Sequence, residues 1–214
     1  MFTKKKAVFI AAAAVLVIGT AGFASKLYTV TYSGHSTSYP QYTYIPSDAE
    51  LNKSVGFVPE VLDELGGFEY KSATVVHSMR NDEADGSSIA FEEISLKYQN
   101  GDREIIVFAE EDFGFDDHSN LDVTDNIGNV DIRYSSYISK DVPPDYELTE
   151  EDKRREQNGE IAIAYGASEV RERFVQQVFF TVGDVCYDIL DNYGKVTKDE
   201  LVEMAAQIIN TVNG

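Results

Sequence analysis

The pattern of apolar and polar positions is most regular at the C-terminal end of the chain. Thr197 and Glu200 form a T-x-x-E capping pair, which satisfies backbone N–H groups at the start of a helix. Six apolar residues then recur three or four positions apart: Leu201, Met204, Ala205, Ile208, Ile209 and Val212. This spacing places them in one stripe, so we expect an amphipathic helix that packs on a sheet.

From Phe68 onward the pattern changes to short runs rich in β-branched and aromatic residues, which predict strands. The runs are FEYKSATVVHS, IAFEEISLKY, REIIVFAE, NLDVTD, VDIRYSSY, EIAIAYG, EVRERFVQQVFFT and VCYDIL. Asn100-Gly101, between the second and third runs, is a strong hairpin signal because both residues accept positive φ. NIGN and VGDV predict two further tight turns.

Capping residues predict helices elsewhere. Ser47 and Glu50 form another capping pair, so a short helix should run over residues 48–54. Pro59 suits the first position of a further helical turn in PEVLDEL. Thr149 can cap a helix that is polar all round, and such a helix belongs on the surface rather than in the core.

Together these elements predict an α+β fold. We expect an antiparallel sheet of about seven or eight strands with a short N-terminal helix and a C-terminal amphipathic helix packed on it, preceded by one N-terminal apolar helix. Residues 1–26 would be a signal peptide or membrane anchor, 27–46 a Tyr/Ser/Thr-rich linker, and 47–214 a single extracytoplasmic domain. Two alternatives stay open for the linker: one strand of it pairs onto the domain, or its tyrosines bind glycan or cell wall.

The N-terminal residues predict a segment that directs export, either as a cleaved signal peptide or as a membrane anchor. Lys4, Lys5 and Lys6 precede a charge-free run over residues 7–25, and positive charge before an apolar segment stays on the cytoplasmic side. A bilayer core needs roughly 20 apolar residues and a signal-peptide core up to about 15, so length does not separate an anchor from a cleaved signal. Small residues stand at −3 and −1 of a cut before Ser25. The spacer that follows favours an anchor, and we expect no cytoplasmic domain.

The net charge of the chain limits the classes of partner that it can bind. The chain has 18 basic and 37 acidic residues and a formal charge of −19, and without the first three lysines the count becomes 15 against 37, or −22. Such a surface repels nucleic acid and anionic headgroups, whereas it favours a cationic partner. A solvated acidic surface is the simpler explanation. Cys186 is the only cysteine, so no intramolecular disulfide and no Cys-based zinc site can form.

No residue pattern predicts catalysis. His35, His77 and His118 lie far apart and outside any H-E-x-x-H motif, and only His77 is expected near the core edge. Ser168 has no histidine nearby in sequence. Acidic pairs are too numerous to be informative, and the absence of Trp weakens a carbohydrate-binding hypothesis. We therefore expect no catalytic, cofactor-binding or metal-binding residues and no cofactor.

One segment resembles a calcium loop. Asn81, Glu83, Asp85, Gly86 and Glu92 occupy positions 1, 3, 5, 6 and 12 of an EF-hand pattern, which alternates oxygen ligands around a cation. The match is imperfect and strands flank it, so a polar hairpin loop is the preferred interpretation. The acidic loop at residues 110–122 is a second candidate without recognisable spacing.

The segment VFFTVGDVCYDILDNYGKVTKDELVEMAAQIIN and the stretch GFVPEVLDELGGFEY resemble domain-of-unknown-function family 4367. That family lies outside the membrane in Gram-positive bacterial proteins, and some members carry a cytoplasmic anti-sigma domain. The resemblance implies a strand, a G-D turn, a strand with Tyr187 and a capped helix with Leu201 and Ile208. Because the six residues MFTKKK precede the apolar run, we expect no sigma-binding domain, and the resemblance implies no catalytic residues.

The sequence thus predicts a non-enzymatic domain that binds a protein, peptide or envelope ligand at the outer face of the cytoplasmic membrane. One alternative is a lipid or lipoprotein carrier with an apolar cavity behind Leu201, Met204 and Ile208. A hydrolase is the third, and it would need His77 or His118 beside carboxylates in a cleft.

Overall fold

The structure is a computed structural model that describes residues 30–36, 39–82, 86–114, 118 and 121–214. Within that part of the chain, no helix has both the length and the apolar character needed to cross a membrane. The apolar run at residues 7–25, the lysines before it and the cut before Ser25 lie outside the described residues.

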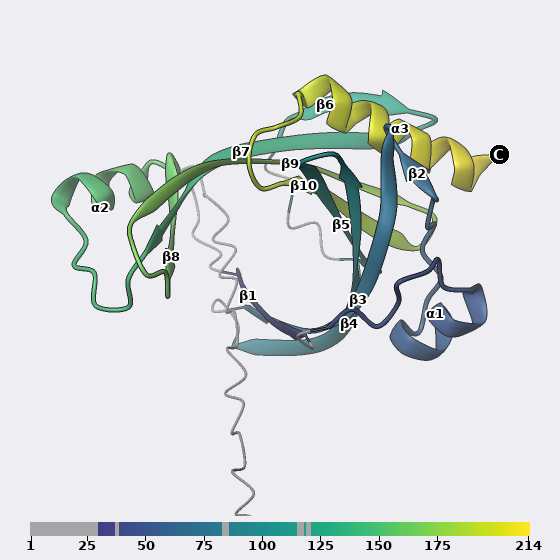
Figure 1. Cartoon of the computed structure of the whole chain (residues 1–214), viewed down its shortest axis with the longest axis horizontal. Coiled ribbons are helices and arrows are strands. Elements are labelled where there is room, and N and C mark those ends of the chain that lie inside the picture. Colours follow the sequence, from purple (N-terminus) through teal and green to yellow (C-terminus); the bar gives the residue numbers. More distant parts are fainter. Residues whose placement is uncertain (1–29, 37–38, 83–85, 115–117, 119–120) are drawn as a thin grey trace, which may run out of the picture.

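The described residues form ten strands and three helices in an α+β arrangement (Figure 1). The helices are α1 (Asp48–Val55), α2 (Glu150–Gln157) and α3 (Lys198–Asn213). The strands are β1 (Val30–Ser36), β2 (Glu64–Leu65), β3 (Phe68–Asp82), β4 (Ser87–Asn100), β5 (Arg103–Glu111), β6 (Val123–Ile127), β7 (Val130–Val142), β8 (Ile161–Tyr165), β9 (Arg171–Val182) and β10 (Val185–Asp191).

All ten strands belong to one sheet with the order β1-β3-β4-β5-β10-β9-β7-β6, while β2 pairs with β3 and β8 pairs with β7. The predicted antiparallel sheet of seven or eight strands is therefore only partly right. Every pair is antiparallel except β7 and β8, which are parallel. The reason is the segment 143–160 with α2 between them, because a crossover with a helix lets a strand return in the same direction.

Two segments outside the expected strands account for the higher number. β1 lies inside the predicted linker and pairs with β3 from Val30↔Asp82 to Ser36↔Val76, as one of the alternatives for that linker allowed. β2 replaces the end of the helical turn expected in PEVLDEL, so that prediction is wrong. Leu65 is fully buried there beside Phe68, and burial of the leucine in the sheet outweighs a weak helix signal.

The predicted hairpins are present, but one turn is shifted. Asn100 pairs with Arg103 across β4 and β5, so the two loop residues are Gly101 and Asp102. Gly101 has a φ of 61° and Asp102 is not among the positive-φ residues, which is the type II′ pattern. Gly101 therefore occupies the first central position of the turn.

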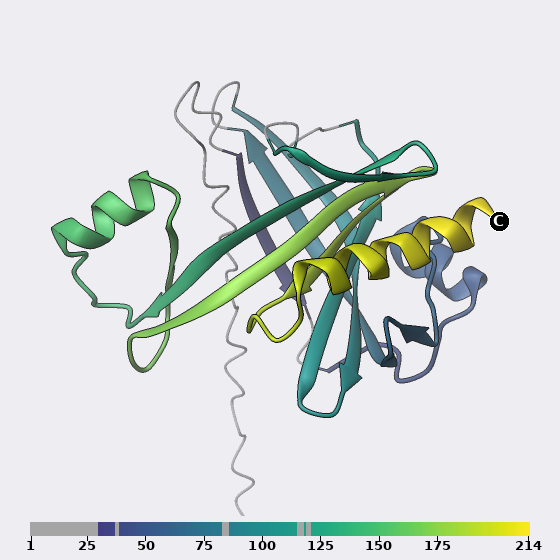
Figure 2. The same ribbon diagram turned by 90° about the horizontal axis from the view of Figure 1, so that it is seen from above.

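The core lies between the outer face of the sheet and the helices α1 and α3. Figure 1 shows the sheet curling from β1 round to β7 with both helices on its outer side, and Figure 2 shows α3 lying across β9 and β10. The predicted helix stripe is confirmed, because Leu201, Met204, Ala205, Ile208 and Ile209 are all buried, while Val212 is 40% exposed. Thr197 and Glu200 exchange their capping hydrogen bonds as expected.

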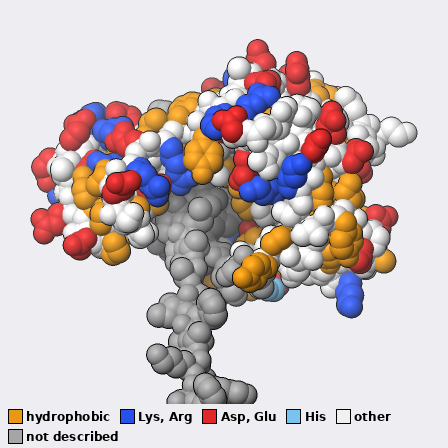
Figure 3. Space-filling model, in the orientation of Figure 1, with side chains coloured by type: hydrophobic (Ala, Val, Ile, Leu, Met, Phe, Trp, Pro, Cys, Tyr) orange, Lys and Arg blue, Asp and Glu red, His pale blue; other side chains and the backbone are white. Residues whose placement is uncertain are grey.

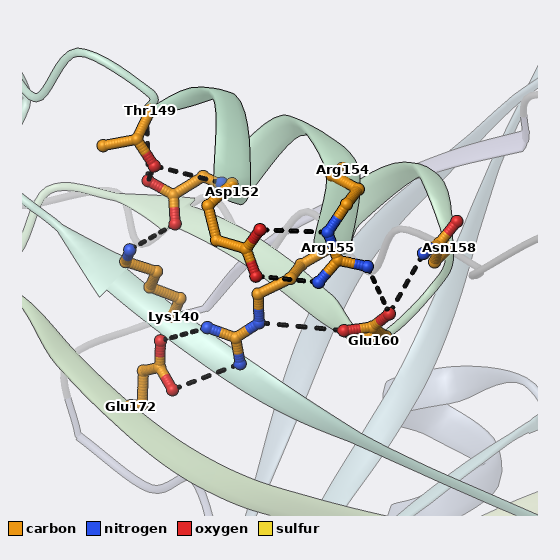
Figure 4. Close-up of polar contacts among 9 residues, drawn as sticks. Lys140, Thr149, Asp152, Arg154, Arg155, Asn158, Glu160 and Glu172 are labelled. Atoms are coloured by element: carbon orange, nitrogen blue, oxygen red, sulfur yellow. Dashed lines mark hydrogen bonds and ion pairs between the residues drawn. The ribbon is translucent and has the colours of Figure 1, made fainter.

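The helix α2 and β8 form a lobe at one end of β7 and β9 (Figures 1 and 4). The helix is polar as predicted, but Asp152 in its first turn is buried and forms an ion pair with the buried Lys140 of β7. Asp152 also accepts hydrogen bonds from Tyr146 and Thr149, both at 2.9 Å. The hydrogen bond from Lys140 is the main reason why the pKa of Asp152 lies well below its ordinary value. This buried charge pair joins α2 to β7, in addition to the pairing of β8 with β7.

Figure 4 also shows the ion pairs that the arginines of α2 form. Arg154 binds Glu151 at 2.7 Å, and Arg155 reaches from the helix to Glu172 on β9 at 2.8 Å. Arg154, Glu151 and Glu172 are exposed and Arg155 is partly exposed, so each pair contributes little to stability.

Candidate ligand-binding face

The inner face of the sheet, defined as the face opposite α1 and α3, carries carboxyl groups in the middle of its strands. Ile94, Ala109 and Tyr187 belong to the core on the outer face. Successive residues of a strand point to opposite faces. The preceding residue of β4, Glu93, and the following residues of β5 and β10, Glu110 and Asp188, therefore lie on the inner face.

Strand register brings these three groups together. Glu93 lies directly opposite Glu110, and Glu110 lies directly opposite Cys186, two residues before Asp188 on β10. Residues in such direct and diagonal positions have Cβ atoms within about 8 Å of one another. We call Glu93, Glu110 and Asp188 the carboxyl cluster.

Two members of the carboxyl cluster, Glu93 and Asp188, have raised pKa values, chiefly because they are buried. Burial raises the pKa of Glu93 from 4.5 to about 7, although the hydroxyl of Ser78, which donates to Oε1 at 3.0 Å, acts in the opposite direction. Burial, followed by the charges of Glu93 and Glu110, raises the pKa of Asp188 well above its ordinary value. Asp188 Oδ1 is buried and accepts no hydrogen bond from any described residue. A desolvated carboxylate without a partner favours a proton or an incoming cation.

Aromatic side chains flank the carboxyl cluster. Asp188 stands between Phe108 of β5 and Phe179 of β9, its direct neighbours across the two ladders. Phe91, two residues before Glu93 on β4, lies on the same face. Phe91 and Phe179 are 9% and 8% exposed. The inner face therefore combines an apolar surround with carboxyl groups at its centre.

The connection from β5 to β6 contacts this face at two points. His118 stacks on Phe179 with ring centroids 3.6 Å apart, and Phe113 meets Phe91 edge to face at 5.8 Å. Phe113 and His118, which belong to the acidic segment at residues 110–122, thus contact the aromatic side chains beside the carboxyl cluster. Residues 115–117 and 119–120 of that segment lie outside the described residues.

Cys186 lies on the inner face directly opposite Glu110, and its thiol is held in the protonated form. Burial raises the pKa of its thiol to about 11, and the nearby charges of Asp112 and Glu110 act in the same direction. The hydroxyl of Thr181 lies 3.2 Å from Sγ. Because the thiolate is the reactive form, a thiol with this pKa is unreactive at neutral pH.

The histidines are divided between the two faces. His118 lies on the inner face through its contact with Phe179. His77 shares the outer face with Val75 and contacts Glu92, with Nδ1 2.8 Å from Oε1. His35 lies on β1 directly opposite His77 in the strand register. Among the side chains that the structure describes, no three His, Cys, Asp or Glu groups are arranged to hold a metal ion.

The calcium-like segment is the end of the β3–β4 hairpin, with Glu83 and Asp85 outside the described residues. Asn81 lies opposite Ser88 and accepts its hydroxyl at 2.8 Å, whereas Glu92 lies opposite His77. These two pairs are four residues apart along the strands, or about 13 Å. First and last ligands of a calcium loop must both reach the ion at about 2.3–2.6 Å. The described geometry therefore favours the polar hairpin interpretation.

Other surface features are less suited to binding. Ser168 is exposed in the connection between β8 and β9. A cleft of 340 Å³ at the end of β3 and β4 has a polar lining, and its Lys71 already pairs with Glu69 at 2.7 Å. Figure 3 shows acidic side chains spread over the visible face and mixed with Lys and Arg, rather than gathered in one patch. The carboxyl cluster stands apart from this mixed surface, because its members lie on neighbouring strands of the inner face.

Sequence reasoning missed the carboxyl cluster. The available signal was an acid within a strand-forming run, as in CYDIL and AFEEI, because Asp and Glu are depleted in strands unless a role retains them. The convergence of Glu93, Glu110 and Asp188 depends on which strands pair, and that information is not in the local pattern.

Comparison of the chain with family models, with curated proteins and with solved structures gave no match. The resemblance to domain-of-unknown-function family 4367 stays a prediction.

Proposed function

We propose that this chain is a non-enzymatic, extracytoplasmic binding domain whose inner sheet face takes a cationic peptide or protein segment at the outer face of the cytoplasmic membrane. The observation that carries the proposal is Asp188, whose buried Oδ1 has no hydrogen-bond partner among the described residues and lies beside Glu93 and Glu110. A Lys or Arg side chain would supply the missing donor and positive charge. The apolar part of the same segment would contact Phe108 and Phe179.

The proposed location at the outer face of the membrane rests on the N-terminal lysines and the apolar run at residues 7–25. These features predict export followed by anchoring or cleavage. The net charge of −19 supports a cationic partner, since it speeds the approach of positive ligands and repels nucleic acid. The partner is therefore defined by chemistry, as a basic segment with neighbouring apolar residues.

The other two functions receive less support. A carrier with a cavity behind α3 would need space beside Leu201, Met204 and Ile208, but these side chains are 0%, 1% and 2% exposed within the core. A hydrolase would need an acid–base pair and a nucleophile in one cleft. The thiol of Cys186, which lies beside the carboxyl cluster, is held in its protonated form.

The test is isothermal titration of the full-length protein with deca-lysine and with a decapeptide of alternating Lys and Phe. Deca-glutamate, a peptide of the opposite charge, is the comparison. Asp188→Asn should weaken binding of the Lys-Phe peptide at least tenfold, because its partner carboxylate is removed. Glu203→Gln removes the same charge from an exposed position of α3 and should leave the affinity unchanged. Equal losses in both variants would show that net charge alone attracts the peptide and would refute the site.

Proton release gives a second readout. Because a bound cation lowers the raised pKa values of Glu93 and Asp188, binding at neutral pH should release protons. Titrations in buffers with different ionisation enthalpies measure this release directly. Binding without proton release would place the peptide elsewhere on the molecule.

A further inference from the structure

The strand β8 forms a free edge of the sheet, because β7 is its only neighbour among the described strands. In this parallel ladder the N–H of Ile138 donates to the carbonyl of Glu160, and the N–H of Gly166 donates to the carbonyl of Val142. Consecutive residues of a strand direct their backbone groups to opposite edges, so the even-numbered residues of β8 face β7. The residues whose N–H and C=O groups point to the free edge are Ile161, Ile163 and Tyr165.

The free edge of β8 lacks the features that usually protect a sheet edge from pairing. Its outward N–H and C=O groups have no hydrogen-bond partner among the described residues. Charged side chains and proline are the common protection, but residues 161–168 contain neither. In contrast, β6 at another edge of the sheet carries Asp125. Tyr165 at the end of β8 is 54% exposed. This edge therefore favours the addition of a further strand.

The sequence of β8 is suited to antiparallel pairing with a second copy of itself. A two-fold axis at Ile163 places this residue opposite its own copy and Ile161 opposite Tyr165 of the second copy. All of these residues direct their backbone groups outward, so each outward N–H meets a carbonyl of the other copy. An aromatic side chain opposite a β-branched one is a favourable pair. An axis at Ala162 or Ala164 would leave one end of β8 without an opposite residue in the strand.

We propose that two copies of this chain associate through antiparallel pairing of their β8 strands about Ile163, which joins the two sheets into one. The strand has five residues, so the interface is smaller than the standard size of about 1,600 Å² and the Kd is on the order of 10–100 µM. The charge of −19 on each copy opposes association, and salt screens this repulsion. The dimer does not depend on the proposed peptide-binding function, because the carboxyl cluster lies on β4, β5 and β10.

The experiment is sedimentation equilibrium of the full-length protein in a mild detergent, at concentrations from about 1 µM to about 1 mM. The unchanged protein should pass from monomer to dimer within this range. Ile163→Lys and Ile163→Pro should each raise the Kd by roughly tenfold or more, because Lys places a charge on the edge and Pro removes an outward N–H that β7 does not use. Val123→Lys is the matched control. It adds the same charge to β6 at a position that is 47% exposed, and it should leave the Kd unchanged.

Amide hydrogen exchange of the unchanged protein gives a second readout that needs no variant. The N–H groups of Ala162 and Ala164 donate to β7 and should be protected at every protein concentration. The N–H groups of Ile163 and Tyr165 should exchange fast in dilute protein and become protected as the dimer forms. Alternate residues of one strand thus report separately on the internal ladder and on the interface.

A protein that stays monomeric over the whole range, or a dimer that survives both Ile163 variants, would overturn the proposal. Fast exchange of the Ile163 and Tyr165 amides within the dimer would do the same, because it places the interface elsewhere. Slower exchange of these amides when the Lys-Phe peptide is added to monomeric protein would assign the edge to a foreign strand and would also overturn it. The proposed function is tested separately, by the titration of Asp188→Asn.

Discussion

We predict that replacing Glu93 of the carboxyl cluster by Gln raises the free energy of unfolding of the domain at high pH, relative to the wild type. Gln keeps an acceptor for the hydroxyl of Ser78, which donates to Oε1 of Glu93 at 3.0 Å. The Gln side chain has no negative charge, whereas burial disfavours the charged form of Glu93. Glu93→Gln therefore imitates the protonated acid at every pH.

The magnitude follows from the pKa of Glu93, which burial raises from its ordinary 4.5 to about 7. The folded state binds this proton more tightly than the unfolded state, so the contribution of Glu93 to stability is present below about pH 4.5 and is lost as the pH rises through about 7. At about 1.4 kcal/mol for each pH unit, the loss is roughly 3 kcal/mol. Wild-type stability should fall over this range, and that of Glu93→Gln should fall by about 3 kcal/mol less.

Urea denaturation followed by circular dichroism, repeated at about pH 4 and about pH 8, measures the difference. The two proteins should be nearly equal at the lower pH and differ by about 3 kcal/mol at the higher one. Glu203→Gln on the exposed face of α3 controls for the loss of one negative charge. A difference between wild type and Glu93→Gln that is the same at both pH values would refute the reasoning.

Three further predictions concern the scaffold and the hairpin. Asp191→Ala should reduce the free energy of unfolding by about 3 kcal/mol in urea denaturation, because the buried carboxylate accepts the backbone N–H groups after β10 at 2.9 and 3.0 Å; a loss within experimental error would contradict these bonds. Asp152→Asn should speed amide hydrogen exchange in β8 by on the order of tenfold and leave β4 unchanged, since Lys140 would lose its buried partner; uniform exchange rates would count against a separate lobe. Millimolar CaCl₂ should leave the thermal midpoint unchanged, because Asn81 and Glu92 lie on separate rungs of the hairpin; a rise would reinstate the calcium loop.

Local sequence determined several elements of this protein. α3 follows from the capping pair Thr197–Glu200 and an apolar stripe, and both signals lie within one helix. The hairpin between β4 and β5 follows from a turn of two residues. The same is true of α2, whose polar composition predicted a surface helix. In each case the interactions that decide the structure join residues close together in the chain.

Tertiary structure decided where chemistry gathers. The parallel pairing of β8 with β7, the addition of β1 to β3 and the buried position of Asp152 depend on contacts between distant segments. The carboxyl cluster arises in the same way. The period of a strand fixes which face a side chain occupies. Only the register between strands fixes its neighbours, and that register is set by the folded sheet as a whole.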